Sequence, residues 1–323
     1  MHIVTREKIM PANLTGRNCH ASHLLPLPDG SLFAVWFEGT KEGENDVCIW
    51  GARRSPDGHW SEKRRLTEED GLPHWNPVLF RKTNGEVLLF FKKGTPIPRW
   101  YTMVQRSGDD CATFSPAQEL GPGDVGGRGP VRNKILRLSN GTLAAPASDE
   151  NGQWRAFIDL STDDGETWHR GDWLQLFPDE EQYHRRGVIQ PTLWESKPGR
   201  IHALLRSSEG CIYRTDSADF GAAWCAPYPI DLPNNNSGID LAPLPDGRLI
   251  LAYNPAGENW GPRNHIALAV SADNGNTWQP LIDLENEPGL HEFSYPCVIA
   301  AGNTLHISYT FDRVNIAYWQ IEM

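Results

Sequence analysis

One short motif recurs along the chain at nearly constant spacing. Residues 161–168 read STDDGETW and residues 271–278 read SADNGNTW, so both follow the pattern S-x-D-x-G-x-T-W. Weaker copies begin at Ser107 and Ser217, and a shortened copy begins at Ser55. Successive copies start 52, 54, 56 and 54 residues apart. A period of this length indicates repeated blades or stacked units rather than one irregular domain.

A glycine turn followed by an apolar run keeps the same period. Four of the six turns are Asp-Gly or Asn-Gly, which are favoured in tight hairpins with positive φ. The turns are Asp29-Gly30, Asn84-Gly85, Asn140-Gly141, Pro198-Gly199, Asp246-Gly247 and Gly302-Asn303. Runs such as residues 32–36 (LFAVW) and 87–91 (VLLFF) read as strands that leave these hairpins. The pattern predicts an all-β fold: a six-bladed β-propeller of four-stranded antiparallel blades, with residues 1–323 as one domain.

The two ends of the chain are expected to close the ring. The last apolar run, residues 314–321, has no hairpin after it, and Ile3-Val4 precedes the first full repeat. Pairing of the two end strands within one blade removes an exposed sheet edge. Helical patterns are almost absent from the sequence. The 13 tryptophans are numerous, and a motif tryptophan can bury its ring between adjacent blades.

Bulk properties exclude several classes of function. The net charge of −11 argues against a nucleic-acid partner, and an acidic substrate would require arginines concentrated in a cleft. No apolar run is long enough to span a membrane, and residues 1–8 lack the apolar segment of a signal peptide, so we expect a cytoplasmic protein. The six cysteines and the histidines show no ligand spacing, which predicts neither a metal nor another cofactor. The sequence does not define the oligomeric state.

The copies at residues 161–168 and 271–278 match the Asp-boxes of sialidases. On these boxes the chain resembles the BNR-repeat, sialidase-like superfamily over nearly its whole length, although it diverges from true sialidases. In that family the boxes are structural hairpins far from the active centre, and they also occur in propellers that are not sialidases. The resemblance therefore implies the fold more strongly than it implies the function.

The resemblance also implies a set of arginines that bind a substrate carboxylate. Arg206, at the end of the run ALLR, and Arg263, before the box at Ser271, match two family arginines. The first family arginine, in a motif of the type F-R-I-P, falls on His20. Arg17 lies three residues earlier, where an odd shift along a strand would turn it to the opposite face.

Three further family positions fall on Gln190, Tyr295 and an acidic loop. Tyr295 stands at the nucleophilic tyrosine, and Gln190 replaces the glutamate that activates it. Glu44 and Asp46 lie in the loop that carries the family acid/base aspartate. A tyrosine without a carboxylate to accept its proton is a poor nucleophile, whereas a histidine in the cleft acts as an acid or base near neutral pH. These departures favour another acidic sugar, such as a uronate. The chain is also similar to histidine-dependent rhamnosidases and rhamnose–glucuronate lyases of the same wider group, in the architecture and in the placing of a central histidine but not in a shared motif.

Polar clusters recur about ten residues before the hairpin glycines, where the innermost strands begin. Besides His20, Gln190 and Tyr295, they supply Asn76, Arg132, Asn133, Lys134 and Asn236 as candidate substrate contacts. Each has a structural alternative. His20 can be a buried histidine bonded to backbone, the arginines can form ion pairs, and Tyr295 can be a packed strand aromatic. Glu44 and Asp46 can belong to a solvated charge run.

The sequence leaves three functions open. The leading one is a glycoside hydrolase that cleaves the bond to a terminal acidic sugar, with Arg132, Arg206 and Arg263 on the carboxylate and His20, Tyr295, Glu44 or Asp46 moving protons. The second is a polysaccharide lyase in which His20 or Tyr295 takes the proton beside a uronate carboxylate. The third is a non-catalytic glycan-binding propeller. In each case the expected partner is an acidic oligosaccharide or glycan.

Overall fold

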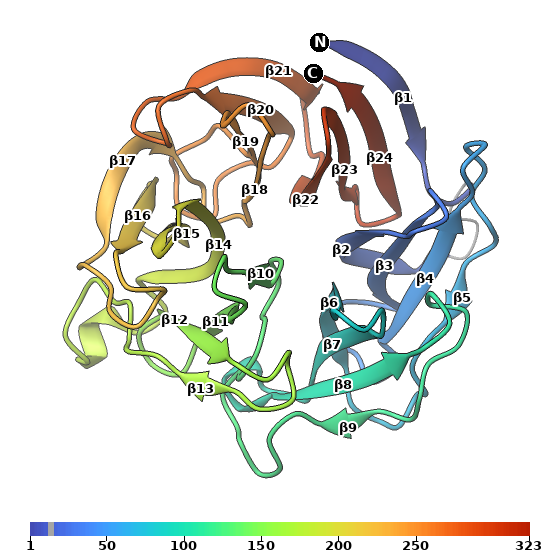
Figure 1. Ribbon diagram of the computed structural model, residues 1–323, viewed down its shortest axis with the longest axis horizontal. Helices are drawn as coiled ribbons and strands as arrows, with labels where there is room; N and C mark the ends of the chain where they lie inside the picture. The colour runs from blue at the N-terminus through green and yellow to red at the C-terminus, as the bar shows by residue number, and fades with distance from the viewer. Residues whose placement is uncertain (12–15) are drawn as a thin grey trace.

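The described residues, 1–11 and 16–323 of a computed structural model, form six four-stranded antiparallel sheets arranged around a central axis (Figure 1). Each sheet is a blade whose first strand lies nearest the axis and whose last strand lies at the rim. The six-bladed propeller predicted from the repeat period is therefore confirmed. The structure identifies the repeat with one blade, since each full copy of the motif follows the third strand of its blade.

Five blades use four consecutive strands, and the sixth combines strands from both ends of the chain. Blade 1 contains β2 (Asn18–Pro26), β3 (Leu32–Gly39), β4 (Cys48–Arg54) and β5 (Arg64–Arg65), and blade 2 contains β6 (His74–Arg81), β7 (Val87–Lys93), β8 (Tyr101–Ser107) and β9 (Gln118–Glu119). Blade 3 contains β10 (Leu136–Arg137), β11 (Leu143–Asp149), β12 (Arg155–Ser161) and β13 (His169–Arg170), and blade 4 contains β14 (Val188–Lys197), β15 (Arg200–Ser207), β16 (Cys211–Ser217) and β17 (Tyr228–Pro233). Blade 5 contains β18 (Asp240–Pro243), β19 (Leu249–Tyr253), β20 (His265–Ser271) and β21 (Gln279–Asn286), and blade 6 contains β22 (Phe293–Ala301), β23 (Thr304–Phe311), β24 (Asn315–Glu322) and β1 (His2–Lys8).

Blade 6 closes the ring with both ends of the chain, as predicted. The N-terminal β1 pairs antiparallel with the C-terminal β24, from His2 opposite Glu322 to Lys8 opposite Ala317. In Figure 1 the two termini lie side by side at the rim of this blade. The pairing gives the last blade its fourth strand and covers an edge that would otherwise be open.

The Asp-boxes form compact turns that are satisfied by their own side chains. In the box at Ser271, Asp273 accepts hydrogen bonds from the backbone N–H of Thr277 at 2.9 Å and from the Thr277 hydroxyl at 2.6 Å. The Ser271 hydroxyl donates to Asp273 and accepts from the N–H of Gly275, both at 2.8 Å. The box at Ser161 repeats these contacts. The motif therefore closes a turn locally and needs no ligand.

Apolar packing joins neighbouring blades. Trp168 of the box in blade 3 lies edge-on against Phe90 of blade 2, with ring centroids 6.2 Å apart, as expected for a motif tryptophan between blades. Trp36 of blade 1 and Trp194 of blade 4 are fully buried. Burial of large side chains of this kind stabilises the fold by about 1.5–3 kcal/mol each.

Four innermost strands share a bulge at the same point. Their registers shift between His20 and His23, Trp75 and Val78, Ile189 and Thr192, and Ser294 and Cys297. At each shift one residue has positive φ: Ala21, Asn76, Gln190 or Tyr295. A bulge of this kind re-aims a side chain, and holding a non-glycine residue there costs about 1–2 kcal/mol. In three of the four strands a proline follows, and its missing N–H suits a break in the ladder.

Helical structure is slight, as the sequence predicts. Within residues 1–11 and 16–323 it consists of two short 3-10 turns, η1 (Ile97–Arg99) and η2 (Glu181–Tyr183). Neither turn, nor any other part of those two ranges, forms a helix with the length and apolarity of a membrane span.

Candidate active site

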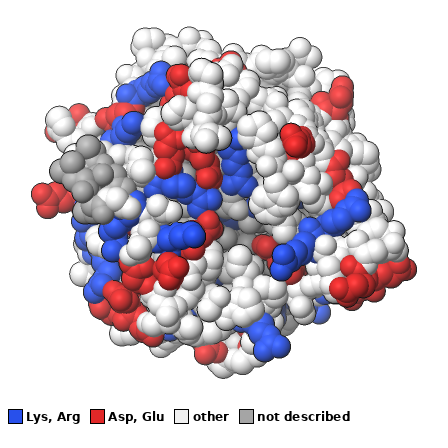
Figure 2. Space-filling model, turned by 180° about the vertical axis from the view of Figure 1, so that it is seen from behind, with Lys and Arg blue, Asp and Glu red and all other residues white. Residues whose placement is uncertain are grey.

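A pocket of about 700 Å³ opens at the end of the ring where the innermost strands begin. All six blades contribute to its lining, through the starts of these strands and the loops between second and third strands. The lining residues are Glu42, Trp75, Asn76, Ile97, Trp100, Glu150, Trp154, Gln190, Arg206, Trp260, Gly261, Arg263, His291, Glu292, Tyr295 and Arg313. On the face drawn in Figure 2, acidic and basic side chains gather around a central hollow. The volume suits a small ligand such as one or two sugars.

Arg206 carries a buried positive charge toward this pocket. Its side chain is 3% exposed and leaves β15 toward the axis. Its Nε donates to Oδ1 of Asn236 at 2.8 Å, and its Nη1 donates to Oε1 of Gln190 at 3.1 Å and to the Tyr295 hydroxyl at 2.6 Å. All three partners are neutral, and no carboxylate of the described residues is within ion-pair distance of Arg206. A buried cation without a counter-ion is costly, so this position favours an anionic ligand.

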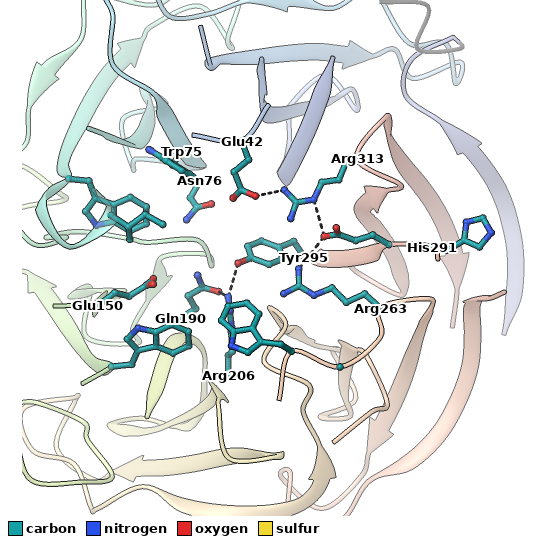
Figure 3. A pocket seen from close by; sticks show the side chains of 16 residues that line it. Glu42, Trp75, Asn76, Glu150, Gln190, Arg206, Arg263, His291, Tyr295 and Arg313 are labelled. Carbon is teal, nitrogen blue, oxygen red and sulfur yellow. Dashed lines mark hydrogen bonds and ion pairs between the residues drawn. The ribbon is translucent and has the colours of Figure 1, made fainter. Parts of the chain in front are cut away.

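Tyr295 lies at the centre of the site, among guanidinium groups (Figure 3). The Cζ atoms of Arg132, Arg206 and Arg263 lie 4.9, 5.6 and 5.8 Å from the centroid of its ring. The bulge in β22 turns the tyrosine so that its hydroxyl faces the pocket and accepts from Arg206. Each cation is close enough to be attracted to the face of the ring. The Tyr295 hydroxyl therefore lies directly beside Arg206, the guanidinium to which an anionic ligand would bind.

Glu292 neutralises the other two arginines of the pocket. Its Oε1 lies 3.1 Å from Nη1 of Arg263 and 2.9 Å from Nε of Arg313, and it also accepts from the Ser294 hydroxyl at 2.8 Å. Burial raises the pKa of Glu292, but the hydrogen bond and charge of Arg313, aided by Arg263, outweigh it and hold the pKa below its ordinary value. Arg313 also pairs with Glu42. These two arginines are therefore already partly neutralised, unlike Arg206.

Glu150 differs from the other carboxylates in the pocket. It follows β11 in the loop to β12, and in Figure 3 its carboxyl group points inward from the side opposite Arg263. Burial raises the pKa of Glu150 to about 7, against the opposing charge of Arg206. None of its side-chain oxygens pairs with a cation in the part of the chain that the structure describes. At neutral pH this group is therefore divided between its acid and carboxylate forms, which suits proton transfer.

His20 lies beneath Tyr295 rather than in the pocket lining. The two rings are 4.1 Å apart between centroids, and Nδ1 of His20 is 2.7 Å from the Thr310 hydroxyl. The side chain is 1% exposed. Burial lowers the pKa of His20 well below its ordinary value, and nearby arginines act in the same direction, so the ring is neutral at pH 7. In blade 1 the bulge residue equivalent to Tyr295 is Ala21, one position after the histidine.

The other expected site residues divide into two groups. Asn76, Gln190, Arg206, Arg263 and Tyr295 line the pocket. Asn236 supports it from below, since its side chain binds Arg206 and its carbonyl oxygen accepts from Nη2 of Arg263 at 3.2 Å. The structure brings these six residues together from blades 2, 4, 5 and 6, which is the convergence predicted from the repeat.

The remaining candidates have structural partners outside the lining. Arg132 donates to the carbonyl oxygens of Ile239 and Pro296, and Asn133 donates to those of Gln190 and Pro191, so both cross-link blades below Tyr295. Lys134 pairs with the buried Asp240.

The acidic loop of blade 1 presents a different residue from those expected. Asp46 accepts from the backbone N–H and hydroxyl of Thr40 and lies 3.3 Å from Arg17, and both charged residues lie outside the lining. Glu44 is also outside the lining. It is Glu42 of this loop that reaches the pocket and pairs with Arg313. Glu42 and Glu44 are two positions apart in the same loop, and the path of that loop, rather than the repeat, decides which of them faces the pocket.

Family comparison agrees with the architecture. The family model described as a BNR repeat-like domain matches residues 30–307, which is most of the chain. The chain belongs to the BNR repeat-like domain family. None of the curated proteins matches this BNR repeat-like protein in sequence.

Solved structures with the same fold include several sialidases. The Hadza microbial sialidase Hz136 has a TM-score of 0.80 at 19% identity, over 99% of this chain and 68% of that one. A protein of unknown function from Dyadobacter fermentans has a TM-score of 0.78 at 14% identity, over 99% and 98% of the two chains. Trypanosoma rangeli sialidase in complex with the inhibitor DANA has a TM-score of 0.74 at 11% identity, over 98% of this chain and 59% of that one. At these identities the likeness establishes the fold alone.

Proposed function

We propose that this BNR repeat-like protein is a glycoside hydrolase that releases a terminal sugar carrying a carboxylate. The observation that carries the proposal is Arg206, a buried guanidinium that faces the pocket and has only neutral partners among the described residues. A sugar carboxylate supplies the missing negative charge, and a guanidinium binds it through two parallel hydrogen bonds. Arg263, on the adjacent loop, adds positive charge on the same side of the pocket.

The proposed reaction uses Glu150 as the acid. In its protonated form it gives a proton to the leaving oxygen while the bond between that oxygen and the anomeric carbon breaks. Water then adds to the anomeric carbon and returns a proton to Glu150, so the sugar gains a hydroxyl and the leaving group gains a hydrogen. A pKa of about 7 keeps a sizeable acid fraction at neutral pH, where an ordinary glutamate is ionised.

In this proposal the Tyr295 hydroxyl lies next to the anomeric carbon of the bound sugar. Its hydroxyl oxygen, held by Arg206 at 2.6 Å, faces the pocket beside the proposed carboxylate site. An oxygen at this place stabilises the positive charge that develops on the sugar ring as the glycosidic bond breaks. The neutral His20 beneath the ring packs against it and holds its orientation.

The test is a screen of oligosaccharides that end in different acidic sugars, with the product masses measured. Hydrolysis adds one water to the sum of the products. The Tyr295→Phe variant should release far less product, because it loses the hydroxyl and keeps the ring. Tyr183→Phe is the matched control, since that tyrosine stacks on Phe177 with centroids 4.4 Å apart and is not part of the pocket lining. Absence of any cleaved acidic sugar, with a folded protein, would reject the hydrolase.

One observation favours β-elimination as a second candidate. Gln190, an amide, is where the resemblance places a glutamate, and no carboxylate of the described chain bonds to Tyr295. A tyrosine beside an arginine-bound carboxylate can instead take the proton from the carbon next to that carboxylate. Elimination adds no water and leaves an unsaturated uronate, which absorbs in the ultraviolet. The same mass measurement therefore separates the two reactions.

A further inference from the structure

A serine, a histidine and an aspartate of blade 4 form a hydrogen-bonded chain on the opposite face of the propeller. The Ser196 hydroxyl lies 2.7 Å from Nε2 of His202, and Nδ1 of His202 bonds to Oδ1 of Asp216. Ser196 belongs to the end of β14, His202 to β15 and Asp216 to β16, so three successive strands bring them together. This group lies at the Asp-box end of the blade, where β14 turns into β15, away from the pocket around Tyr295.

Local structure explains why the serine is presented to solvent. The register of β14 with β15 shifts between Glu195 and Lys197, which makes Ser196 the extra residue of a bulge just before the hairpin. The serine is exposed, whereas His202 is only 8% exposed and stacks on Trp194 with centroids 4.8 Å apart. A packed histidine therefore holds a fixed orientation toward an accessible hydroxyl.

The hydrogen bonds define the state of the histidine. Nδ1 of His202 contacts both the Asp216 carboxylate, which only accepts, and Nη2 of Arg214, which only donates. The closer contact is the one with Asp216, so we assign the hydrogen to Nδ1, and Nε2 is left to accept from Ser196. Tyr228 donates to the other oxygen of Asp216 at 2.6 Å, and Nε of Arg214 donates to the first at 2.9 Å, so the aspartate is held on both sides. This is the arrangement in which histidine acts as a base toward a serine hydroxyl.

A side-chain amide lies beside the pair. Nδ2 of Asn274 is 3.2 Å from Nε2 of His202, while its Oδ1 accepts from the indole N–H of Trp194 at 2.8 Å. The indole fixes the orientation of the amide, so its N–H₂ group faces Nε2 of His202. Ser196 and Asn274 both line a cavity of about 750 Å³ between blades 4 and 5, together with the hairpin around Asp246. A donor in this position can bind the oxygen of a tetrahedral intermediate.

We propose that Ser196, His202 and Asp216 form a second, serine-hydrolase site that cleaves short-chain acyl esters. Ser196 Oγ attacks the ester carbonyl carbon while its proton passes to Nε2 of His202. The bond to the alcohol oxygen then breaks, and the alcohol leaves with that proton. Water attacks the acyl-serine, its proton passes through His202 to Ser196 Oγ, and the carboxylic acid is released. Asn274 binds the carbonyl oxygen as it becomes negative, and Asp216 is a positioning residue.

Arg214 is expected to lower the rate of ester hydrolysis. Its Nη2 lies 3.1 Å from Nδ1 of His202, so a cation stands beside the ring that becomes positive in each step. The guanidinium repels the positive charge that develops on the ring in the transition state, while the carboxylate of Asp216 stabilises that charge. We therefore expect slow turnover of unactivated esters and measurable reaction with activated ones.

The first experiment uses a fluorophosphonate probe on the full chain, followed by peptide mass mapping. Attack by Ser196 forms a serine–phosphonate bond and releases fluoride, so the adduct should fall on the peptide that contains Ser196. S196A should abolish labelling and leave the fold intact, because the side chain is exposed. The matched control is S61A, since Ser61 is also exposed and its hydroxyl donates to the carbonyl oxygen of Glu62.

The second experiment measures hydrolysis of 4-nitrophenyl acetate. N274D keeps the size of the side chain and its acceptor for Trp194 but removes the N–H₂ donor, and should lower the rate roughly 10²-fold. S196A should lower the rate to that of the ester in buffer alone, whereas S61A should keep the wild-type rate. Neither S196A nor N274D should change release of acidic sugars by the pocket of Tyr295. Probe adducts absent from Ser196, or ester hydrolysis equal in S196A and wild type, would overturn the proposal.

Discussion

The two ends of the propeller treat charge in different ways. At the Asp-box end, Asp163 and Asp273 bind the threonines and serines of their own turns. At the pocket end, Arg206 is buried with neutral partners, and Glu150 is half-buried without a cation among the described residues. The box turns are therefore satisfied by their own side chains, whereas the pocket leaves a cation and an acid to be satisfied by a ligand. This contrast separates the box aspartates, which maintain the fold, from Arg206 and Glu150, which are available for chemistry.

The largest expected effect comes from removing the unpaired cation. Arg206→Met keeps much of the side-chain length and should lower kcat/KM on an acidic oligosaccharide roughly 10³-fold, because two charge-assisted hydrogen bonds to the substrate are lost. Its melting temperature should change little, because removal of a buried charge without a counter-ion offsets the loss of the donor to Asn236 and Gln190. Steady-state kinetics measure the change in kcat/KM, and a thermal melt measures the change in melting temperature. A clear loss of stability with little change in kcat/KM would place Arg206 among the structural arginines.

Arg214→Met provides the comparison on the other face. Arg214 is 4% exposed, and it donates to Asp216 and to the backbone of Asn274 in blade 5. Its removal should destabilise the fold by about 1–2 kcal/mol, allowing for the partial exposure of Asp216. Acidic-sugar release by the remaining folded protein should be unchanged. If Arg206→Met lowered stability and kept activity, while Arg214→Met lowered activity and kept stability, the contrast between the two arginines would be wrong.

The next effect concerns Glu150. Glu150→Gln should lower kcat roughly 10²-fold, because the amide occupies the same space without supplying a proton. In the wild type the acid form is needed, so activity should be retained below pH 7 and should fall as the pH rises through about 7. A pH–rate profile checks this, with Glu180→Gln as a control at an exposed position. A profile with no decline near pH 7 would remove Glu150 from the mechanism.

A smaller effect is expected at the self-satisfied end. Asp273→Ala removes the acceptor for Thr277 and Ser271 and should cost about 1–2 kcal/mol of folding free energy. Denaturant unfolding measures this cost, and Asp231→Ala is a control at an exposed aspartate. Since the box lies away from the pocket, KM for an acidic oligosaccharide should not change. A raised KM would connect the box to the site.

The smallest effect is a dependence of stability on acid. Hydrogen bonds from Thr167 and Thr277 hold the pKa of Asp163 and Asp273 at about 2, below their ordinary value of 3.8. A carboxylate with a lowered pKa stabilises the fold fully above pH 3.8 and progressively loses this contribution as the pH falls toward 2. Melting temperatures between about pH 2 and 5 should therefore show a smaller acid-induced decrease in Asp273→Ala than in the wild type. Equal decreases would mean that the box carboxylates do not titrate in this range.

Much of the site was predictable because the repeat places equivalent positions around one axis. Gln190, Arg206, Arg263 and Tyr295 were identified from their phase relative to the hairpins and from family resemblance, and they line one pocket. Asn-Pro, Gln-Pro and Tyr-Pro at residues 76–77, 190–191 and 295–296 mark the bulges and were a usable signal. Glu150, Glu42 and Arg313 carried no such signal, because they lie in the loops between the second and third strands of their blades rather than at the bulges of the innermost strands.

By itself, the sequence determined the number of blades, the positions of the box turns and the closure of the ring. These features depend on local hydrogen bonds and on apolar spacing, which are written into short stretches of chain. Tertiary structure alone decided which charges meet. His20 lies under Tyr295 instead of in the pocket, Arg313 shares Glu292 with Arg263, and Arg206 is left with neutral partners. Charge pairing depends on distances between residues remote in sequence, and a shift of one residue at a bulge changes the face on which a side chain lies.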